Sequence, residues 1–217
     1  MMWNAIPTAM VCLDQNPRTE TMQALCRVAW HFGAMNLYPA INGARVGIPP
    51  WFGGTPGAWG CWRSHLELWE RMLSDDTTAL AVFEDDVVTH AEPTERTRLA
   101  DFLAHVPDDW DMVYLGGQVW AGTVPQFVSD GVYRAVNLNR THGYVVRNTE
   151  RVKAAYWRLA TMQPSIAHQW HIDYVLGDLM QAGALTVYMP ARWFVGQAGG
   201  VSSTSGKKHA ELWWEWQ

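Results

Sequence analysis

Short apolar runs and longer stripes of apolar residues at helical spacing alternate along this chain. The short runs predict strands, at residues 8–13, 37–41, 79–83, 112–115, 132–136, 144–146 and 185–188. The stripes predict helices, at residues 19–32, 58–73, 95–103, 149–162 and 172–181. Strands that alternate with helices favour an α/β fold, in which a mostly parallel central sheet is flanked by helices within a single domain. In such sheets, ligands gather at the carboxyl ends of the strands.

Two segments interrupt the pattern. Residues 43–57 contain too many glycines and prolines for regular structure, so we expect a loop. Residues 197–208 are rich in glycine and serine and end in Lys207 and Lys208, which predicts either a lid over a diphosphate or a disordered tail. A Walker loop is excluded because a lysine follows Lys207. The tryptophan-rich end of this flexible segment, 197–217, either docks onto the body, lines an acceptor groove or mediates dimerisation.

Composition narrows the class of protein. A chain of 217 residues with 48% hydrophobic and 17% charged residues has the size and make-up of one folded domain. A net charge of −5 excludes general attraction to nucleic acid or anionic membranes. The three cysteines are widely spaced without a CxxC pair, so neither a disulfide framework nor a zinc site is indicated. Fourteen tryptophans favour aromatic walls around a binding cleft. We find no signal-type leader and no apolar run of about 18 residues, and we therefore expect a soluble, cytoplasmic protein.

Three consecutive carboxylates, Glu84, Asp85 and Asp86, follow directly after the apolar run 79–83. An interior strand delivers its last residues to the rim of the sheet, where three anions repel one another unless a cation joins them. Oxygen ligands of this kind suit Mg²⁺ or Mn²⁺, which often bind a phosphorylated substrate. The alternative is an acidic turn in water. The position of the three carboxylates directly after a buried strand favours a metal site over this alternative.

The stretch 60–66, Gly-Cys-Trp-Arg-Ser-His-Leu, is followed by a helix and then by 81–87, Ala-Val-Phe-Glu-Asp-Asp-Val. Together these motifs resemble the GCxxSH and LEDD signature of glycosyltransferase family 25, which includes lipopolysaccharide-type and collagen galactosyltransferases. Later blocks also resemble the family, at 114–116, 141–144 and 171–173. The resemblance implies a Rossmann-related GT-A fold that transfers a hexose, galactose or glucose, from a UDP-sugar with inversion at the anomeric carbon.

The same resemblance implies a metal-binding pair. Glu84 and Asp86 form an E-x-D version of the family's D-x-D, and residues two apart in an extended segment face the same side. We expect Asp86 to be the main metal ligand. We expect Glu84 either to lie just outside the metal ligands or to contact the nucleotide. If the chain turns sharply after the strand, Asp85 and Asp86 exchange these roles. His209 either completes the metal shell or is a solvated terminal histidine.

Other residues follow from the remaining blocks. Inversion needs a base for the acceptor hydroxyl, and Asp173 is the candidate, the alternative being that it caps a helix. Family members carry a basic, Asp-containing loop after the first strand, where this chain has only Asp14 and Arg18. The expected donor contacts are Asp14, Arg18, Ser64, Glu84, Asp85, Gly117, Gln118 and His142. His65 is expected to be a hydrogen-bonded core histidine.

The sequence leaves the acceptor and one different class of function open. A glycan acceptor is favoured by the family resemblance. A hydroxylated DNA base is a second acceptor, with tryptophans to stack on an extruded base and a local basic patch to offset the acidic balance. That patch comprises Arg140, Arg147, Arg151 and Lys153. A noncatalytic carbohydrate-binding module and a metal-dependent phosphoesterase are the remaining alternatives, and the acidic strand end argues against the first.

Overall fold

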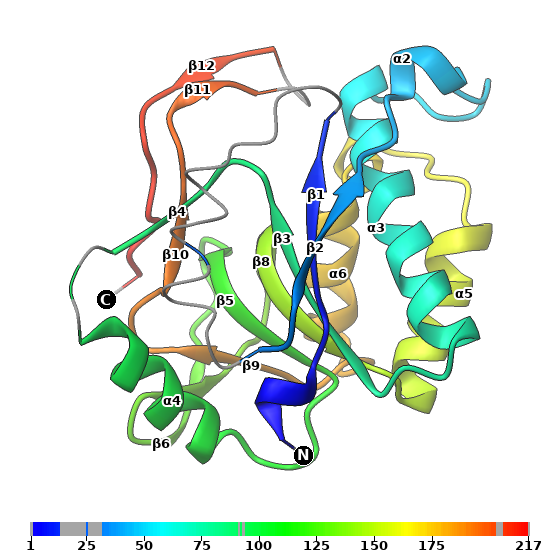
Figure 1. The fold of residues 1–217 in the computed structure, drawn as a ribbon. Helices are drawn as coiled ribbons and strands as arrows, with labels where there is room; N and C mark the ends of the chain where they lie inside the picture. Colours follow the sequence, from blue (N-terminus) through cyan, green and yellow to red (C-terminus); the bar gives the residue numbers. More distant parts are fainter. Residues whose placement is uncertain are drawn as a thin grey trace.

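The structure is a computed structural model that describes residues 2–13, 25, 32–90, 92, 94–202 and 206–216 (Figure 1). Within these residues an eight-stranded sheet forms the centre, in the order β2-β1-β3-β8-β5-β9-β7-β6. Its strands are β1 Thr8–Cys12, β2 Met35–Pro39, β3 Ala79–Glu84, β5 Met112–Val119, β6 Gln126–Ser129, β7 Val132–Arg134, β8 Leu138–Arg147 and β9 Val187–Pro190. Their pairings give one direction to all of them except β7 and β8. The predicted α/β fold with a mostly parallel sheet is confirmed.

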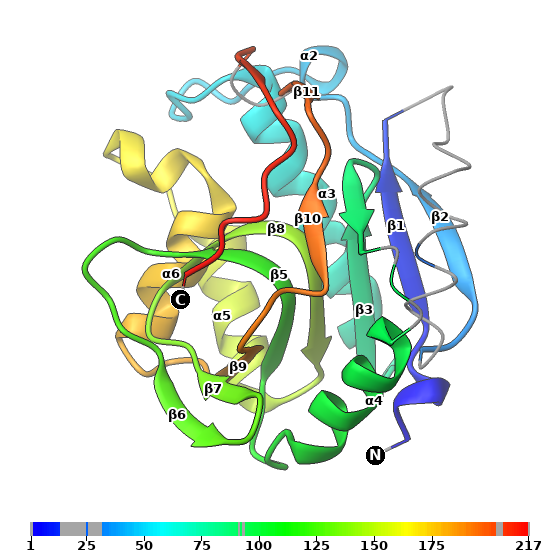
Figure 2. The same ribbon diagram turned by 90° about the vertical axis from the view of Figure 1, so that its left-hand side faces the viewer.

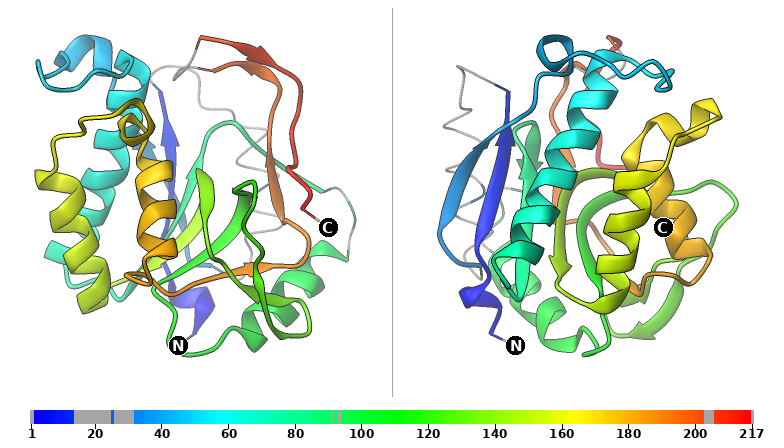
Figure 3. Two further views of the ribbon diagram at one scale, coloured as in Figure 1. Left: turned by 180° about the vertical axis from the view of Figure 1, so that it is seen from behind. Right: turned by 90° about the vertical axis from the view of Figure 1, so that its right-hand side faces the viewer.

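Helices cover both faces of this sheet. Figures 1 and 3 show α3, α5 and α6 together on one face and α4 on the other. Their bounds are α3 Pro56–Ser74, α4 Glu95–His105, α5 Glu150–Thr161 and α6 Ile172–Gln181, with a short α2 Gly43–Val46 and 3₁₀ turns η1 Trp3–Ala5 and η2 Ala167–Trp170. Because side chains alternate along a strand, β3 serves two cores. Leu80 and Val82 pack on the α3 side, whereas Ala81 and Phe83 pack on the α4 side.

The C-terminal part of the chain folds back across the sheet, where β10 Val195–Gln197 contacts β5 and β8 (Figure 2). Strand β10 pairs with β4 Val87–Thr89, and β11 Gly200–Val201 pairs with β12 Lys208–His209 (Figure 1). Trp193 Nε1 donates to the carbonyl of Trp214 at 3.1 Å, and the ring of Trp213 stacks on that of His90 with centroids 3.8 Å apart. The aromatic end of the chain therefore docks onto the body.

Some predicted boundaries are wrong. The predicted loop 43–57 contains α2, because the side chain of Asn42 accepts a hydrogen bond from Ala44 N at 3.0 Å and caps it. The predicted strand 112–115 continues through the glycines as β5, since it pairs with β8 along that length. A Cβ on Gly116 would lie 2.3 Å from the carbonyl oxygen of Val195, so this close approach requires glycine. The predicted helix 19–32 lies almost entirely outside the described residues.

Helix α3 begins with a well-defined cap. The hydroxyl of Thr55 accepts from Ala58 N at 3.1 Å, and Pro56 occupies the first turn, where its missing N–H costs no hydrogen bond. Further along, Trp62 and Trp69 are almost completely buried against the sheet. In the part of the chain that the structure describes, neither this helix nor another is both long and apolar enough to cross a bilayer.

The cap predicts a stability difference between two threonines. We expect Thr55→Ala to lower the free energy of unfolding by about 1 kcal/mol, because the helix loses its side-chain cap. Thr94→Ala is the matched control, since Thr94 precedes α4 without a side-chain cap bond, and it should change stability by less than about 0.5 kcal/mol. Urea denaturation of both variants measures the difference, and equal losses would contradict the assignment.

Candidate functional site

Two adjoining cavities open at the sheet edge where β1 and β3 end and where α3 and α6 begin. The larger has a volume of about 780 Å³ and the smaller about 510 Å³. Leu13, Cys61, Glu84 and Asp85 line both of them. The carboxyl ends of the parallel strands thus carry the site, as expected for an α/β sheet.

The three consecutive carboxylates all line the larger cavity. The expected extended geometry across 84–86 is wrong, because β3 ends at Glu84 and the chain turns at Asp85 and Asp86 before β4 begins. The turn is tied to β10 and the residue after it: Asp86 Oδ2 accepts from Gln197 Nε2 at 2.7 Å, and the carbonyl of Asp86 accepts from Ala198 N at 2.6 Å. Asp85 and Asp86 therefore line the cavity from one turn.

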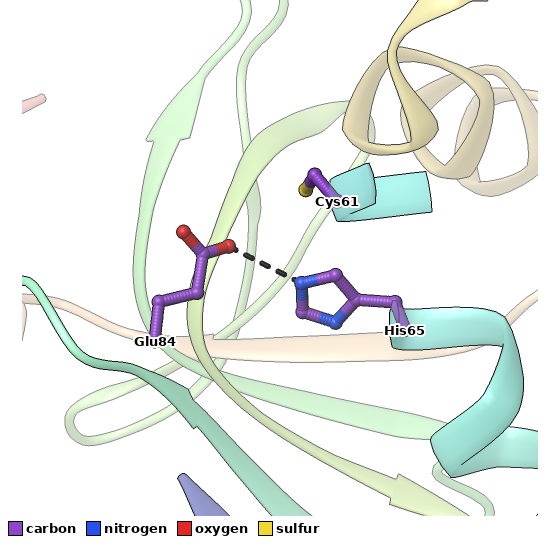
Figure 4. A group of neighbouring side chains, drawn as sticks. All are labelled: Cys61, His65 and Glu84. Atoms are coloured by element: carbon purple, nitrogen blue, oxygen red, sulfur yellow. Dashed lines mark hydrogen bonds and ion pairs between the residues drawn. The ribbon is translucent and has the colours of Figure 1, made fainter. Parts of the chain in front are cut away.

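A chain of hydrogen bonds holds Glu84 from the core side. Its Oε1 accepts from Thr141 Oγ1 at 2.6 Å and lies 3.3 Å from His65 Nε2 (Figure 4). The other nitrogen of His65 lies 2.9 Å from the hydroxyl of Tyr144, which also accepts from Trp69 Nε1 at 3.1 Å. Burial alone would raise the pKa of Glu84, but the hydrogen bonds from His65 and Thr141 outweigh it and lower the pKa. The carboxylate is thus ionised at neutral pH. His65 is the hydrogen-bonded core histidine that the sequence predicted.

Cys61 joins this group from the same helix as His65. Its Sγ, a nitrogen of His65 and a carboxylate oxygen of Glu84 lie within 4.8 Å of one another. Burial raises the pKa of the thiol, and the charges of Glu84 and Asp173 raise it further. Sequence reasoning missed this cluster because it looked for a CxxC pair. The signal was the spacing of four residues, which puts Cys61 and His65 on one face of a helix.

Asp173 faces the larger cavity from the first turn of α6. Its Oδ2 accepts from the backbone N–H of Arg140 at 2.9 Å, while the cap position belongs to His171. Arg140 has φ +74°, a left-handed conformation that costs a non-glycine residue about 1–2 kcal/mol. The bond to Asp173 helps to hold that conformation. The alternative that Asp173 only caps its helix is therefore wrong.

Three histidines line the larger cavity: His171, which precedes α6, and the predicted site residues His142 and His209. His142 is 1% exposed, and burial lowers its pKa to about 4, so it is neutral at physiological pH. Its ring tilts toward that of Trp214, with centroids 5.5 Å apart. His209 lies on β12, and within the described residues its buried Nδ1 has no hydrogen-bond partner. The alternative of a solvated terminal histidine is wrong for His209, which shares a cavity with Glu84 and Asp86.

Of the remaining predicted donor contacts, one lines a cavity, two do not, and two lie outside the described residues. Ser64 lines the smaller cavity, but its hydroxyl donates to the carbonyl of Gly60 at 2.7 Å and accepts from Ile41 N at 2.8 Å, so it joins α3 to the segment after β2. Gly117 and Gln118, expected as donor contacts, lie within β5 and line neither of these two cavities. Asp14 and Arg18 lie outside the described residues.

Three cationic side chains line the larger cavity in addition to the carboxylates. Arg140, Lys207 and Lys208 line it together with the acidic turn. The guanidinium of Arg140 lies 4.9 Å from the ring centre of Trp214, and its Nε donates to Gln118 Oε1 at 3.3 Å. A cavity with both signs of charge suits a ligand that combines phosphates with a metal ion.

Comparisons with known proteins agree with the motifs. Residues 55–117 match the family model described as glycosyltransferase family 25 (LPS biosynthesis protein). The probable inactive glycosyltransferase 25 family member 3 of Bos taurus is 35% identical over 65 residues, which make up 29% of this chain. The match spans only 11% of the length of that relative.

Two solved structures are distantly similar in fold. A glycosyltransferase involved in the glycosylation of the major capsid of PBCV-1 has a TM-score of 0.44 and 11% identity, over 82% of this chain and 76% of that one. A UDP-glucose pyrophosphorylase complexed with UDP-glucose has a TM-score of 0.46 and 9% identity, over 85% and 90% of the two chains. The resemblance to glycosyltransferase family 25 is confirmed over residues 55–117, the segment that matches the model of that family.

Proposed function

We propose that this protein is a metal-assisted, inverting glycosyltransferase that moves a hexose from a UDP-sugar to an acceptor hydroxyl on a glycan. One observation carries the proposal: the acidic turn, Asp173 and three cations line a single cavity of about 780 Å³. This cavity continues into a second one that is large enough for a nucleoside.

The smaller cavity is the proposed nucleoside site. Its wall includes the apolar residues Val11 and Ile41 and the start of α3, at Thr55, Pro56 and Gly57. A diphosphate that leaves this cavity past Glu84 and Asp85 enters the larger one, where Lys207 and Lys208 can neutralise its charge. The nucleobase contacts expected from Asp14 and Arg18 remain a prediction.

A divalent ion, Mn²⁺ or Mg²⁺, is proposed at the acidic turn. Asp86 is its main carboxylate ligand, with Asp85 or Glu84 beside it. His209 lines the same cavity, and within the described residues its buried Nδ1 has no hydrogen-bond partner. His209 is therefore the proposed nitrogen ligand, and the side chains must draw together around the ion to complete a mixed oxygen and nitrogen shell. Bound there, the ion supplies charge neutralisation for the departing UDP.

Asp173 is the proposed general base. The N–H of Arg140 donates to one of its oxygens at 2.9 Å and so orients the carboxylate, which lines the cavity. In an inverting displacement, the acceptor oxygen bonds to the anomeric carbon as the bond to UDP breaks, and the acceptor proton passes to Asp173. His171 and Tyr174 line the cavity beside it and offer aromatic surface for a sugar acceptor.

The basic residues that would attract DNA are engaged with other groups of the protein. Arg147 donates to the carbonyl of Asp108 at 2.7 Å, Arg151 pairs with Asp111 at 3.0 Å, and Lys153 pairs with Glu150 at 2.7 Å. Arg140 lines the cavity instead. Since these cations already have protein partners, a glycan acceptor is the better supported one.

The metal assignment predicts a ligand-dependent change in stability. UDP-galactose or UDP-glucose with Mn²⁺ should raise the melting temperature, and 100-fold excess over Kd corresponds to about 2.7 kcal/mol of stabilisation. Asp86→Ala should abolish this rise, while Asp101→Ala on the exposed side of α4 should keep it. A thermal-shift assay with and without Mn²⁺ measures the effect. An unchanged rise in Asp86→Ala would refute the assignment.

The base assignment predicts a defect in chemistry rather than in binding. Asp173→Asn keeps an oxygen for the N–H of Arg140 but cannot take a proton, so kcat for sugar transfer should fall by about 10²–10⁴-fold with little change in the donor KM. Asp178→Asn is the control on the same helix, because Asp178 pairs with His168 outside the cavity lining. Wild-type kcat in Asp173→Asn would exclude the proposed base.

Because relatives of the matched segment carry the word inactive in their names, activity itself needs a direct test. Release of UDP from the sugar donor in the presence of Mn²⁺ should exceed the rate of a noncatalytic sugar-binding module, which releases none. A phosphoesterase would instead consume phosphomonoesters. If neither donor releases UDP at concentrations where it stabilises the protein, the proposed enzymatic activity is contradicted. The protein would then only bind the nucleotide sugar.

A further inference from the structure

The cluster of Cys61, His65 and Glu84 has the composition of a zinc site rather than of a magnesium site. Thiolate and imidazole ligands select Zn²⁺, whereas Mg²⁺ and Mn²⁺ prefer oxygen. Within the described part of the chain, this trio is the one group of three such side chains whose ligand atoms all lie within 4.8 Å of one another. From these three side chains we propose that the protein binds Zn²⁺ through Cys61 Sγ, His65 Nε2 and a carboxylate oxygen of Glu84.

The backbone positions the three ligands before any ion arrives. Cys61 and His65 are four residues apart on α3 and project from the same face, and Glu84 reaches them from the end of β3 (Figure 4). Ligand atoms in a tetrahedral zinc site are about 3.3–3.8 Å apart, given Zn–N and Zn–S distances near 2.0 and 2.3 Å. The His65 and Glu84 atoms already lie 3.3 Å apart. A short inward movement of the thiol completes the geometry.

The surrounding hydrogen bonds resemble those that orient metal ligands. The hydroxyl of Tyr144 lies 2.9 Å from Nδ1 of His65, and Thr141 donates to Glu84 at 2.6 Å. In metal sites, a partner on the second ring nitrogen sets the orientation of the histidine. When Zn²⁺ binds, the thiol proton of Cys61 leaves to solvent, and His65 binds through Nε2 as the tautomer that carries its hydrogen on Nδ1. That N–H donates to the oxygen of Tyr144, whose own hydroxyl hydrogen then points away from the ring.

An ion can reach the three side chains from solvent and keep one coordination position open. All three ligands line the smaller cavity, and Cys61 and Glu84 also line the larger one. Three protein ligands leave the fourth position of a tetrahedral ion for water or for an oxygen of a bound ligand. The proposed site is therefore of the open kind. It is separate from the ion proposed at Asp86, and only Glu84 is common to both.

Co²⁺ is the probe for this site, because a cobalt–thiolate bond gives a charge-transfer band in the near ultraviolet and tetrahedral cobalt gives intense visible bands. Titration of the Cys12→Ala/Cys26→Ala variant, which keeps Cys61 as its only cysteine, should produce both features, and one equivalent of Zn²⁺ should remove them. X-ray absorption of the zinc form should show one sulfur near 2.3 Å among nitrogen and oxygen ligands near 2.0 Å.

Substitutions test whether the ion binds at these three side chains. Cys61→Ser should abolish the charge-transfer band and weaken Zn²⁺ binding by about 100-fold or more, and Tyr144→Phe should weaken it by about 10-fold through loss of orientation. Asp86→Ala is the matched control and should keep the cobalt spectrum, so failure of this site and failure of the proposed transferase metal are distinguishable. Circular dichroism of each ion-free variant checks the fold. No thiolate band at saturating Co²⁺, or a band that persists in Cys61→Ser, would overturn the proposal.

Discussion

The last residue of β3, Glu84, carries a partly buried carboxylate that two hydrogen bonds stabilise. An ionised carboxylate that is removed from water costs several kcal/mol unless hydrogen bonds compensate it. Glu84 receives that compensation from Thr141 on β8 and His65 on α3, and Trp69 and Tyr144 support the histidine in turn. One polar chain therefore joins a helix and two strands beside the last residue of β3, where both cavities open.

The end of that strand has consequences for the rest of the site. Because the chain turns at once, Asp85 and Asp86 enter the larger cavity together, and the turn becomes an attachment point for the C-terminal part of the chain through Gln197 and Ala198. That part brings His209 and Trp214 to the same cavity. Residues more than a hundred positions apart in sequence thus line one cavity.

The family segment and the site overlap only in part. Residues 55–117 contain the acidic turn and the cluster on α3, whereas Asp173, Arg140 and His209 come from later in the chain. The proposed ion-binding groups are therefore mostly shared with the family segment, and the proposed base is supplied by α6. The bovine relative named as probable inactive matches this chain over 65 residues only. The cavity also includes residues from later in the chain.

Local patterns determined much of this protein. Apolar runs and helical stripes identified α3, α5, α6 and the core strands, because burial of one face or of a whole strand imposes a period on the sequence. The position after a buried strand indicated the acidic residues, and the family resemblance of the block 171–173 indicated Asp173. Tertiary structure alone decided the rest. Gly116 and Gly117 resemble a turn in sequence, but pairing with β8 keeps them in a strand, and the approach of Cys61 and His65 to Glu84 depends on how α3 packs against the sheet. Such contacts join residues distant in sequence, and a local pattern carries no information about that packing.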